Sequence, residues 1–430
     1  MPSSKSTVHD DGSLVVLLGD LIAGTLTRLA GGRLRFNYDE QYRATNGATP
    51  LSVSMQTPIA SHLDAAIAPW LAGLLPDNDA VLARWSRDFH TSRTPFALLS
   101  TPVGRDCAGA VRFAHPDEVE DLLAAPGTVS WLSEPEVAGR LRALRADSTA
   151  WLGSDFTGQF SLAGAQAKTA LLFEDGRWGV PSGSTATSHV LKPAVAGLDD
   201  HDLNEHICLD AARRAGLIAA RTRVARFEDQ SAIVVDRYDR RTVGDRLVRI
   251  HQEDLCQALG TYPADKYENQ GGPGARDVAR LLRQVMPSAA AERAIWQFAD
   301  ALAWNWLIAG TDAHAKNYSL LLSGADVRLA PLYDVASALP YGMSEHKLRF
   351  AMKVGGDYDV YSCSRNTWAK AAHELRLDAD AVATRIRELA ERTPDALRDA
   401  AAAPGVAELD SPLPTRLVDL VAARVSRLMA

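Results

Sequence analysis

The segment spanning residues 295–334 constrains the fold of this chain more than any other part of the sequence. Its first section carries apolar residues at the i, i+3 and i+4 spacing of a helix that packs against a core: Ile295, Phe298, Ala299, Leu302, Ala303, Trp306 and Leu307. Gly310 lies near the end of this helix, and the loop Thr311-Asp312-Ala313-His314-Ala315-Lys316-Asn317 follows. A short hairpin is predicted next, ending at Leu332-Tyr333-Asp334. The segment therefore predicts a buried helix that leads into a polar loop and, one hairpin later, a second acidic position.

The spacing of the polar residues in this segment indicates a chemistry. Asp312 and Asn317 are five residues apart, as are the aspartate and asparagine of the protein-kinase catalytic loop, where Asp accepts the proton of the attacking hydroxyl and Asn holds a metal ion. Asp334 follows where kinases place their main Mg²⁺ ligand. Taken singly, each acid has a structural alternative: Asp312 is a common residue in the turn that ends a helix, and Asp334 is a common N-cap. The three in this order favour an ATP-dependent phosphotransferase, with Asp312 as the catalytic residue and Asn317 and Asp334 as Mg²⁺ ligands.

Length and composition bound the remaining possibilities. A chain of 430 residues is too long for one compact core, so we expect two or more domains. The net charge of −7 and pI of about 5.9 argue against nucleic-acid binding by the electrostatics of this chain alone. Four scattered cysteines without a C-x-x-C pair predict neither disulfides nor a zinc site, and fit a reducing cytosol. We expect a cytoplasmic protein without a membrane segment, because neither a signal core nor a spanning apolar run is present.

The hydrophobic patterns divide the chain into three parts. Residues 13–123 read as a small α+β domain, in which the alternation at residues 51–55 predicts a strand. Residues 150–250 predict a sheet with one prominent helix at 202–215, which is how a kinase N-lobe is built. Residues 251–430 are mostly helical and predict the C-lobe.

Two segments of the middle part predict phosphate contacts. The loop at residues 161–169 is rich in small residues, which let backbone N–H groups approach phosphates; a tight hairpin turn is the alternative, since the loop matches neither G-x-G-x-x-G nor a Walker motif. Lys192 ends the apolar strand at 189–192 and is predicted to neutralise phosphates, with Glu205 as its partner; a solvated edge-strand lysine is the alternative.

Other residues are assigned to the same nucleotide. The backbone of the segment Asp236-Arg237-Tyr238 is predicted to meet the adenine edge. His314 and Lys316 lie inside the catalytic loop, where structural support and plain solvation are the respective alternatives to a phosphate contact. The predicted ATP-binding residues are Ala163, Gly164, Ala165, Gln166, Ala167, Lys168, Lys192, Asp236, Arg237, Tyr238, His314, Ala315, Lys316, Asn317 and Asp334.

These segments resemble the HipA-type serine/threonine kinases, which are toxins of bacterial toxin–antitoxin pairs. The resemblance covers most of the chain, from about Gly19 to Tyr341, and its motifs occur in the same order. The matching segments are residues 50–54, 73–78, 104–111, 161–172, 189–192, 204–205, 235–240, 252–257, 266–274, 311–317 and 332–334.

The resemblance implies an α+β, two-lobed protein-kinase-like fold with an extra N-terminal domain. It implies ATP and Mg²⁺ as cofactors, with Asp312 as proton acceptor, and places phosphates on Lys192 and the loop 163–168. Ser161 falls on the serine that the family autophosphorylates to switch itself off, since an added phosphate could eject the loop that cradles ATP. One position departs from the family: Ala167 stands where the family loop usually has Glu.

The resemblance also implies partners. The family pairs with a small dimeric helix-turn-helix antitoxin on operator DNA, and the substrate in its best-known branch is an aminoacyl-tRNA synthetase. Two other functions stay open: a transcriptional co-repressor acting with the antitoxin, and a small-molecule phosphotransferase of the aminoglycoside or choline type. The latter enzymes share the spacing of Asp312 and Asn317, but they do not predict the N-terminal segments or the Ser161 loop.

Overall fold

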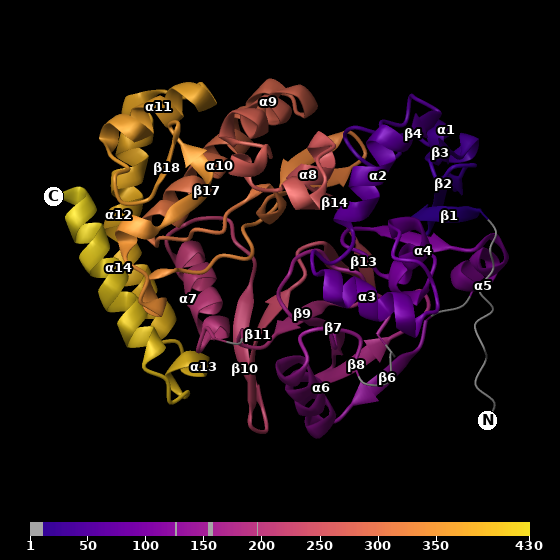
Figure 1. Ribbon diagram of the computed structural model, residues 1–430, viewed down its shortest axis with the longest axis horizontal. Coiled ribbons are helices and arrows are strands. Elements are labelled where there is room, and N and C mark those ends of the chain that lie inside the picture. The colour runs from indigo at the N-terminus through magenta and orange to yellow at the C-terminus, as the bar shows by residue number, and fades with distance from the viewer. Residues whose placement is uncertain (1–11, 125–126, 154–157, 196) are drawn as a thin grey trace.

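The computed structural model describes residues 12–124, 127–153, 158–195 and 197–430. Figure 1 shows the N-terminal part, coloured indigo to purple, on one side of the molecule and the C-terminal helices, coloured orange to yellow, on the other. The magenta strands of the middle part lie between and below them. The pocket described in the next section lies where these parts meet.

The N-terminal part contains an antiparallel sheet with the strand order β4-β3-β2-β1-β5. Its strands are β1 (Ser13–Leu18), β2 (Leu21–Arg28), β3 (Leu34–Tyr38), β4 (Ser61–Leu63) and β5 (Val111–Ala114). Its helices are α1 (Glu40–Ala44), α2 (Asp64–Gly73), α3 (Asp79–Asp88), α4 (Pro95–Leu99) and α5 (Val119–Ala124). Strict alternation of buried and exposed residues along β3 shows that this sheet has one face on the core.

The strand predicted at residues 51–55 is wrong. Only an isolated bridge joins Ser52 to Met55, and the chain turns between them. The backbone N–H of Val53 donates to the buried carboxyl of Glu253 at 2.8 Å, so a contact with a distant part of the chain overrides the local pattern.

The middle part contains a second sheet with the order β10-β11-β9-β7-β8-β6. Its strands are β6 (Val129–Leu132), β7 (Thr169–Glu174), β8 (Arg177–Pro181), β9 (His189–Lys192), β10 (Thr222–Phe227) and β11 (Gln230–Asp236). Helix α7 (His201–Arg214) packs against β10 and β11, and α6 (Glu134–Ala146) also contacts them. One hydrophobic core runs from Leu14 and Phe36 of the first sheet to Leu191 and Val234 of the second. The division at residues 13–123 and 150–250 stays a prediction.

The C-terminal part is mostly helical and surrounds α10 (Ser288–Leu307). A small sheet, β14-β15-β16, carries the hairpin predicted before Asp334. Its strands are β14 (His251–Asp254), β15 (Ser319–Ser323) and β16 (Asp326–Leu329). A hairpin of β12 (Arg240–Val243) and β13 (Arg246–Arg249) precedes this sheet in the sequence. A second hairpin, of β17 (Arg349–Val354) and β18 (Asp357–Asp359), follows it. The other helices are α8 (Leu255–Leu259), α9 (Ala275–Val285), α11 (Arg365–Leu375), α12 (Ala379–Ala401), α13 (Pro404–Ala407) and α14 (Leu413–Met429).

Two further features concern the cysteines and the longest helices. All four cysteines are buried and free. Across the described ranges, we find no helix with the length and apolar character needed to cross a bilayer.

Candidate active site

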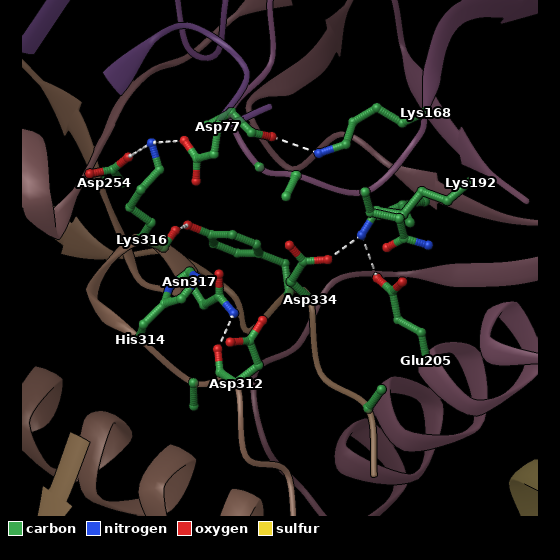
Figure 2. A pocket seen from close by; sticks show the side chains of 18 of the residues that line it. Asp77, Lys168, Lys192, Glu205, Asp254, Asp312, His314, Lys316, Asn317 and Asp334 are labelled. Atoms are coloured by element: carbon green, nitrogen blue, oxygen red, sulfur yellow. Dashed lines mark hydrogen bonds and ion pairs between the residues drawn. The ribbon is translucent and has the colours of Figure 1, made fainter. Parts of the chain in front are cut away.

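A pocket of about 590 Å³ lies between the middle sheet and the C-terminal part. Figure 2 shows charged side chains from both parts, and from the N-terminal part, pointing into it. The predicted residues that line it are Ala163, Gly164, Ala165, Gln166, Lys168, Lys192, Asp236, Arg237, Tyr238, Asp312, His314, Lys316, Asn317 and Asp334. The structure therefore gathers into one cavity residues that lie up to 171 positions apart in the sequence, from Ala163 to Asp334 (334 − 163 = 171).

The loop after α10 is fixed by its own backbone. The N–H of Gly310 donates to the carbonyl of Asn305, and a Cβ on Gly310 would lie 2.4 Å from the Asn305 side-chain oxygen, so a larger residue would displace that buried side chain. The side-chain amide nitrogen of Asn317 donates to the backbone carbonyl of Asp312 at 2.8 Å (Figure 2). This bond fixes the amide so that its oxygen stays available as a ligand. The loop therefore holds Asp312 and Asn317 in a defined relative position.

Asp312 itself is exposed, whereas His314, Lys316 and Asn317 are buried. Its carboxylate accepts a hydrogen bond from the hydroxyl of Tyr267 at 2.7 Å. Tyr267 also packs its ring against His314, with centroids 5.0 Å apart. The sequence assigned no role to Tyr267, although it lies in one of the segments that resemble the family.

Lys192 joins Glu205 and Asp334 (Figure 2). Its ammonium nitrogen lies 2.8 Å from Glu205 Oε1 and also contacts Asp334 Oδ1. The proposed partnership of Lys192 with Glu205 is thus present, and the solvated alternative for Lys192 is wrong. Burial opposes the charged form of Asp334, but Lys192 and Lys168 outweigh it and hold the pKa of this carboxyl below its usual range.

The loop that precedes β7 closes on itself through Lys168. The ammonium of Lys168 donates to the carbonyl of Ala163 at 2.6 Å and lies 5.0 Å from the centre of the Trp151 ring. Gly164 has φ +102°, and a Cβ there would lie 2.7 Å from that ammonium. Burial lowers the pKa of Lys168 to about 8 despite the nearby carboxylates.

Three predicted residues do not line the pocket. The side chain of Ala315 is wholly buried in the C-terminal core, and Ala167 packs against the core of the first two parts. Ser161 is also fully buried: its hydroxyl donates to the carbonyl of Leu74 at 2.8 Å, and its N–H donates to the carbonyl of Asp106. In this conformation the Ser161 hydroxyl is enclosed by protein and is not open to phosphoryl transfer.

The segment predicted to meet adenine runs along the end of β11. The N–H groups of Asp236 and Arg237 donate to the carbonyls of Arg221 and Ser188 within the protein. The guanidinium of Arg237 turns away into a buried cluster with Asp106 and Asp239. The carbonyl of Asp236 and the N–H of Tyr238 stay the predicted backbone contacts with adenine.

Lys316 is not solvated, contrary to the simpler of its two interpretations. Its ammonium lies 3.0 Å from Asp77 Oδ1 and 3.5 Å from Asp254 Oδ2 (Figure 2). Asp77 in turn lies 2.8 Å from the ammonium of Lys266. The sequence assigned no role to Asp77, Asp254 or Lys266; the only signal was that all three lie in segments resembling the family.

Asn317 and Asp334 are the candidate metal ligands of the pocket. Among the described residues, no group of three or more His, Cys, Asp or Glu side chains is arranged to hold an ion by itself. Asp334 and Asn317 offer one carboxylate and one amide oxygen, which are hard ligands of the kind Mg²⁺ prefers. Such a pair fits an ion whose remaining positions are filled by phosphate oxygens and water.

Comparison with known proteins places the chain in a family. The family model of the HipA N-terminal domain matches residues 14–114, and that of the HipA-like C-terminal domain matches residues 160–397. The chain belongs to the HipA family. It is 32% identical over 87% of its length to a Sinorhizobium fredii protein named "Putative kinase Y4mE", covering 89% of that protein. It is 26% identical to the serine/threonine-protein kinase toxin HipA of Shewanella oneidensis, over 90% of this chain and 89% of that one.

A solved structure agrees with this assignment. The complex of Shewanella oneidensis MR-1 HipA and HipB with operator DNA contains a chain that superposes with a TM-score of 0.83 at 24% identity, covering 97% of both chains. The predicted α+β, two-lobed kinase-like fold is thereby confirmed. The enzyme class is confirmed as well: the protein is a HipA-type serine/threonine kinase.

Proposed function

We propose that this kinase uses ATP and Mg²⁺ and acts as the toxin of a toxin–antitoxin pair. The observation that carries the proposal is that Asp312, Asn317, Asp334 and Lys192 line one pocket large enough for a nucleotide. Phosphoryl transfer needs positioning and charge stabilisation more than covalent chemistry, and these residues supply both.

Each residue then has a role. Asp312, exposed in the pocket, accepts the proton of the acceptor hydroxyl. The oxygens of Asn317 and Asp334 hold Mg²⁺, which when bound neutralises charge on the phosphates. Lys192, oriented by Glu205, and Lys168 with its loop bind phosphate oxygens. The carbonyl of Asp236 and the N–H of Tyr238 meet the adenine edge.

Ser161 is the proposed site of autophosphorylation. Its hydroxyl is buried against Leu74, so the loop must leave this position before phosphate can be added. A phosphate carries close to two negative charges at neutral pH and cannot return to a buried site that offers a single carbonyl oxygen. The phosphorylated loop therefore stays out of the pocket, and the kinase loses the loop at residues 163–168 that is proposed to bind the phosphates of ATP.

The proposed partners follow from the relatives. The Shewanella complex contains HipA, HipB and operator DNA, and the match extends over 97% of this chain. We propose a HipB-like antitoxin dimer that supplies most of the DNA contact, since a chain of net charge −7 is poorly suited to it. The proposed compartment is the cytoplasm, and the proposed substrate is a translation component such as an aminoacyl-tRNA synthetase.

The mass of the intact protein after incubation with Mg²⁺ and ATP tests this function. Wild type that starts unmodified is expected to gain one phosphate, mapped to Ser161, while Asp312→Asn gains none. Omitting Mg²⁺ should abolish the gain in wild type. If wild type binds ATP but gains no phosphate, the proposal of autophosphorylation is wrong. If Asp312→Asn gains phosphate, the assignment of Asp312 as the catalytic residue is wrong.

A further inference from the structure

One short segment of the N-terminal part contacts both loops of the proposed active site. Residues 73–77 run from the last residue of α2 into the turn before α3, and Gly73 and Asp77 line the pocket. Figure 2 shows Asp77 reaching toward Lys316 from the opposite side of the cavity to Asp312. The phosphoryl-transfer scheme above gives this segment no role.

The segment holds the predicted phosphate loop by backbone contacts. The N–H of Asp77 donates to the carbonyl of Gly164 at 3.1 Å, in the middle of the loop. The carbonyl of Leu74 accepts from the hydroxyl of Ser161 at 2.8 Å, at the start of the loop. Both contacts depend on the course of the main chain at residues 74–77.

The segment holds the catalytic loop by the side chain of Asp77. One carboxylate oxygen lies 3.0 Å from the ammonium of Lys316, and the other lies 2.8 Å from that of Lys266. Lys316 directly precedes Asn317, and Lys266 directly precedes Tyr267, whose hydroxyl bonds Asp312. The two lysines held by one carboxylate therefore adjoin Asn317, proposed to hold the metal, and Tyr267, which bonds the catalytic base Asp312.

The environment makes this contact strong. The side chains of Asp77, Lys316 and Lys266 are only 7%, 2% and 14% exposed, so solvent screens their attraction little. Burial opposes the charged form of Asp77, but Lys316 and Lys266 outweigh it and lower the pKa of this carboxyl. Asp254, from the C-terminal part, is a second partner of Lys316 at 3.5 Å. Burial opposes the charge on Lys316, but Asp254 and Asp77 together outweigh it and raise the pKa of this lysine.

We propose that Asp77 is a positioning residue, through which the N-terminal domain sets the catalytic loop in register with the phosphate loop. The active site is then completed by a domain that supplies none of the assigned catalytic groups. This inference rests on the proposed function, because it takes residues 161–168 and 311–317 as the two reacting loops.

Asp77→Asn in the full-length, unmodified protein tests the proposal. Asparagine keeps the size of the side chain and the backbone N–H to Gly164, but it has no charge for the two lysines. The rate of autophosphorylation is followed by intact mass at a series of ATP concentrations. We expect the maximal rate to fall by about tenfold or more, because small misplacements of reacting groups are costly. The ATP concentration at half-maximal rate should stay within about twofold, since Lys168 and Lys192 are untouched.

Three further variants separate positioning from other effects. Asp79→Asn removes an exposed carboxylate two residues away and should leave the rate unchanged. Asp77→Glu restores the charge and should recover part of the rate. Lys316→Met should slow wild type more than it slows Asp77→Asn, because the two residues act through one contact. Fully additive effects, or a rise only in the ATP requirement, would overturn the proposal.

Hydrogen exchange gives a readout that does not need activity. In Asp77→Asn the amides of residues 161–168 and 311–317 should exchange faster, while those of α10 keep their protection. Unchanged exchange in both loops, or a uniform loss that includes α10, would contradict a positioning role. If wild type neither binds ATP nor transfers phosphate, the proposed function fails, and the exchange pattern still decides whether Asp77 couples the two loops.

Discussion

Asp106 and Asp312 are two carboxylates in the same molecule with opposite surroundings. Asp106 is buried and accepts from Arg240 at 2.8 Å, Arg249 at 3.0 Å and Arg237 at 3.3 Å, and also from Thr187. Asp312 is exposed, and its carboxylate accepts a hydrogen bond from the Tyr267 hydroxyl. A carboxylate enclosed by cations holds structure together, whereas one that must accept a substrate proton has to keep lone pairs free.

The enclosed carboxylate belongs to a buried cluster that joins two parts of the chain. We call Asp106, Asp239, Arg237, Arg240 and Arg249 the arginine cluster; its acids lie in different parts, 133 positions apart (239 − 106 = 133). Burial opposes the charge on Asp106, but the three arginines outweigh it and hold the pKa of this carboxyl below its usual range. Mutation in the pocket should therefore lower activity with little change in stability, whereas mutation in the arginine cluster should lower stability.

The largest expected effect is on activity and arises at the pocket. Asp312→Asn should lower the rate of phosphate transfer by about a thousandfold or more, because a positioned base contributes about 10²–10⁴. Its free energy of unfolding should stay within about 0.5 kcal/mol of wild type, since the side chain is exposed. Single-turnover kinetics and urea unfolding measure the two quantities. If the variant loses stability as well as activity, the claim that Asp312 serves activity whereas Asp106 serves stability is wrong.

The second effect is on stability and arises at the arginine cluster. Asp106→Asn leaves buried arginines short of a counter-charge and should lower the free energy of unfolding by about 3–5 kcal/mol. Asp229→Asn is the matched control, because it breaks the exposed, solvent-screened pair with Arg142 and should change the free energy of unfolding far less. Urea unfolding with an unchanged slope is the measurement. Equal losses in the two variants would show that burial of the cluster carries no energetic weight.

The same comparison explains how much the sequence could predict. Local patterns located α6 and β9 at their observed bounds, and the spacing of Asp312 and Asn317 located the catalytic loop. These signals are short-range: each depends on the helix period, the strand period or a loop of a few residues. The placement of Lys192 beside Glu205 was within reach for the same reason, because the helix that carries Glu205 directly follows the strand.

The arginine cluster and Asp77 could not be predicted in that way. Asp77 meets Lys266 across 189 positions, and Arg240 meets Asp106 across 134. An isolated acid or arginine in a mixed segment gives no sign of a partner so distant, since charged residues are usually solvated. The failed strand at residues 51–55 has the same origin, because Glu253 holds Val53 from 200 positions away.

A third, smaller effect concerns pH and Lys168. Because burial lowers its pKa to about 8, Lys168 loses its charge between pH 7 and 9, and the affinity for ATP should fall about tenfold over that range. Lys168→Met should bind ATP weakly at pH 7 and show little further change. Titration calorimetry at both pH values measures this. The unfolded chain binds this proton up to about pH 10.5, so the contribution of Lys168 to stability rises with pH above 8.

A pH-independent affinity in wild type would mean that Lys168 does not meet the phosphates. The arginine cluster offers the contrast, since arginines stay charged over the whole range. Asp106→Asn should therefore keep the wild-type pH dependence of ATP binding. The titration is done without urea, at a temperature at which this variant is folded.

The smallest effect is expected at Tyr267, whose hydroxyl donates a hydrogen bond to the Asp312 carboxylate. Tyr267→Phe keeps the ring against His314 but removes the hydroxyl that lies 2.7 Å from Asp312. The site is partly open to solvent, so water can replace this bond, and we expect the maximal rate to fall only about threefold to tenfold. Steady-state kinetics with Tyr262→Phe as an exposed control measure it. A rate that rises instead would show that the hydroxyl occupies the place of the acceptor and competes with it for Asp312.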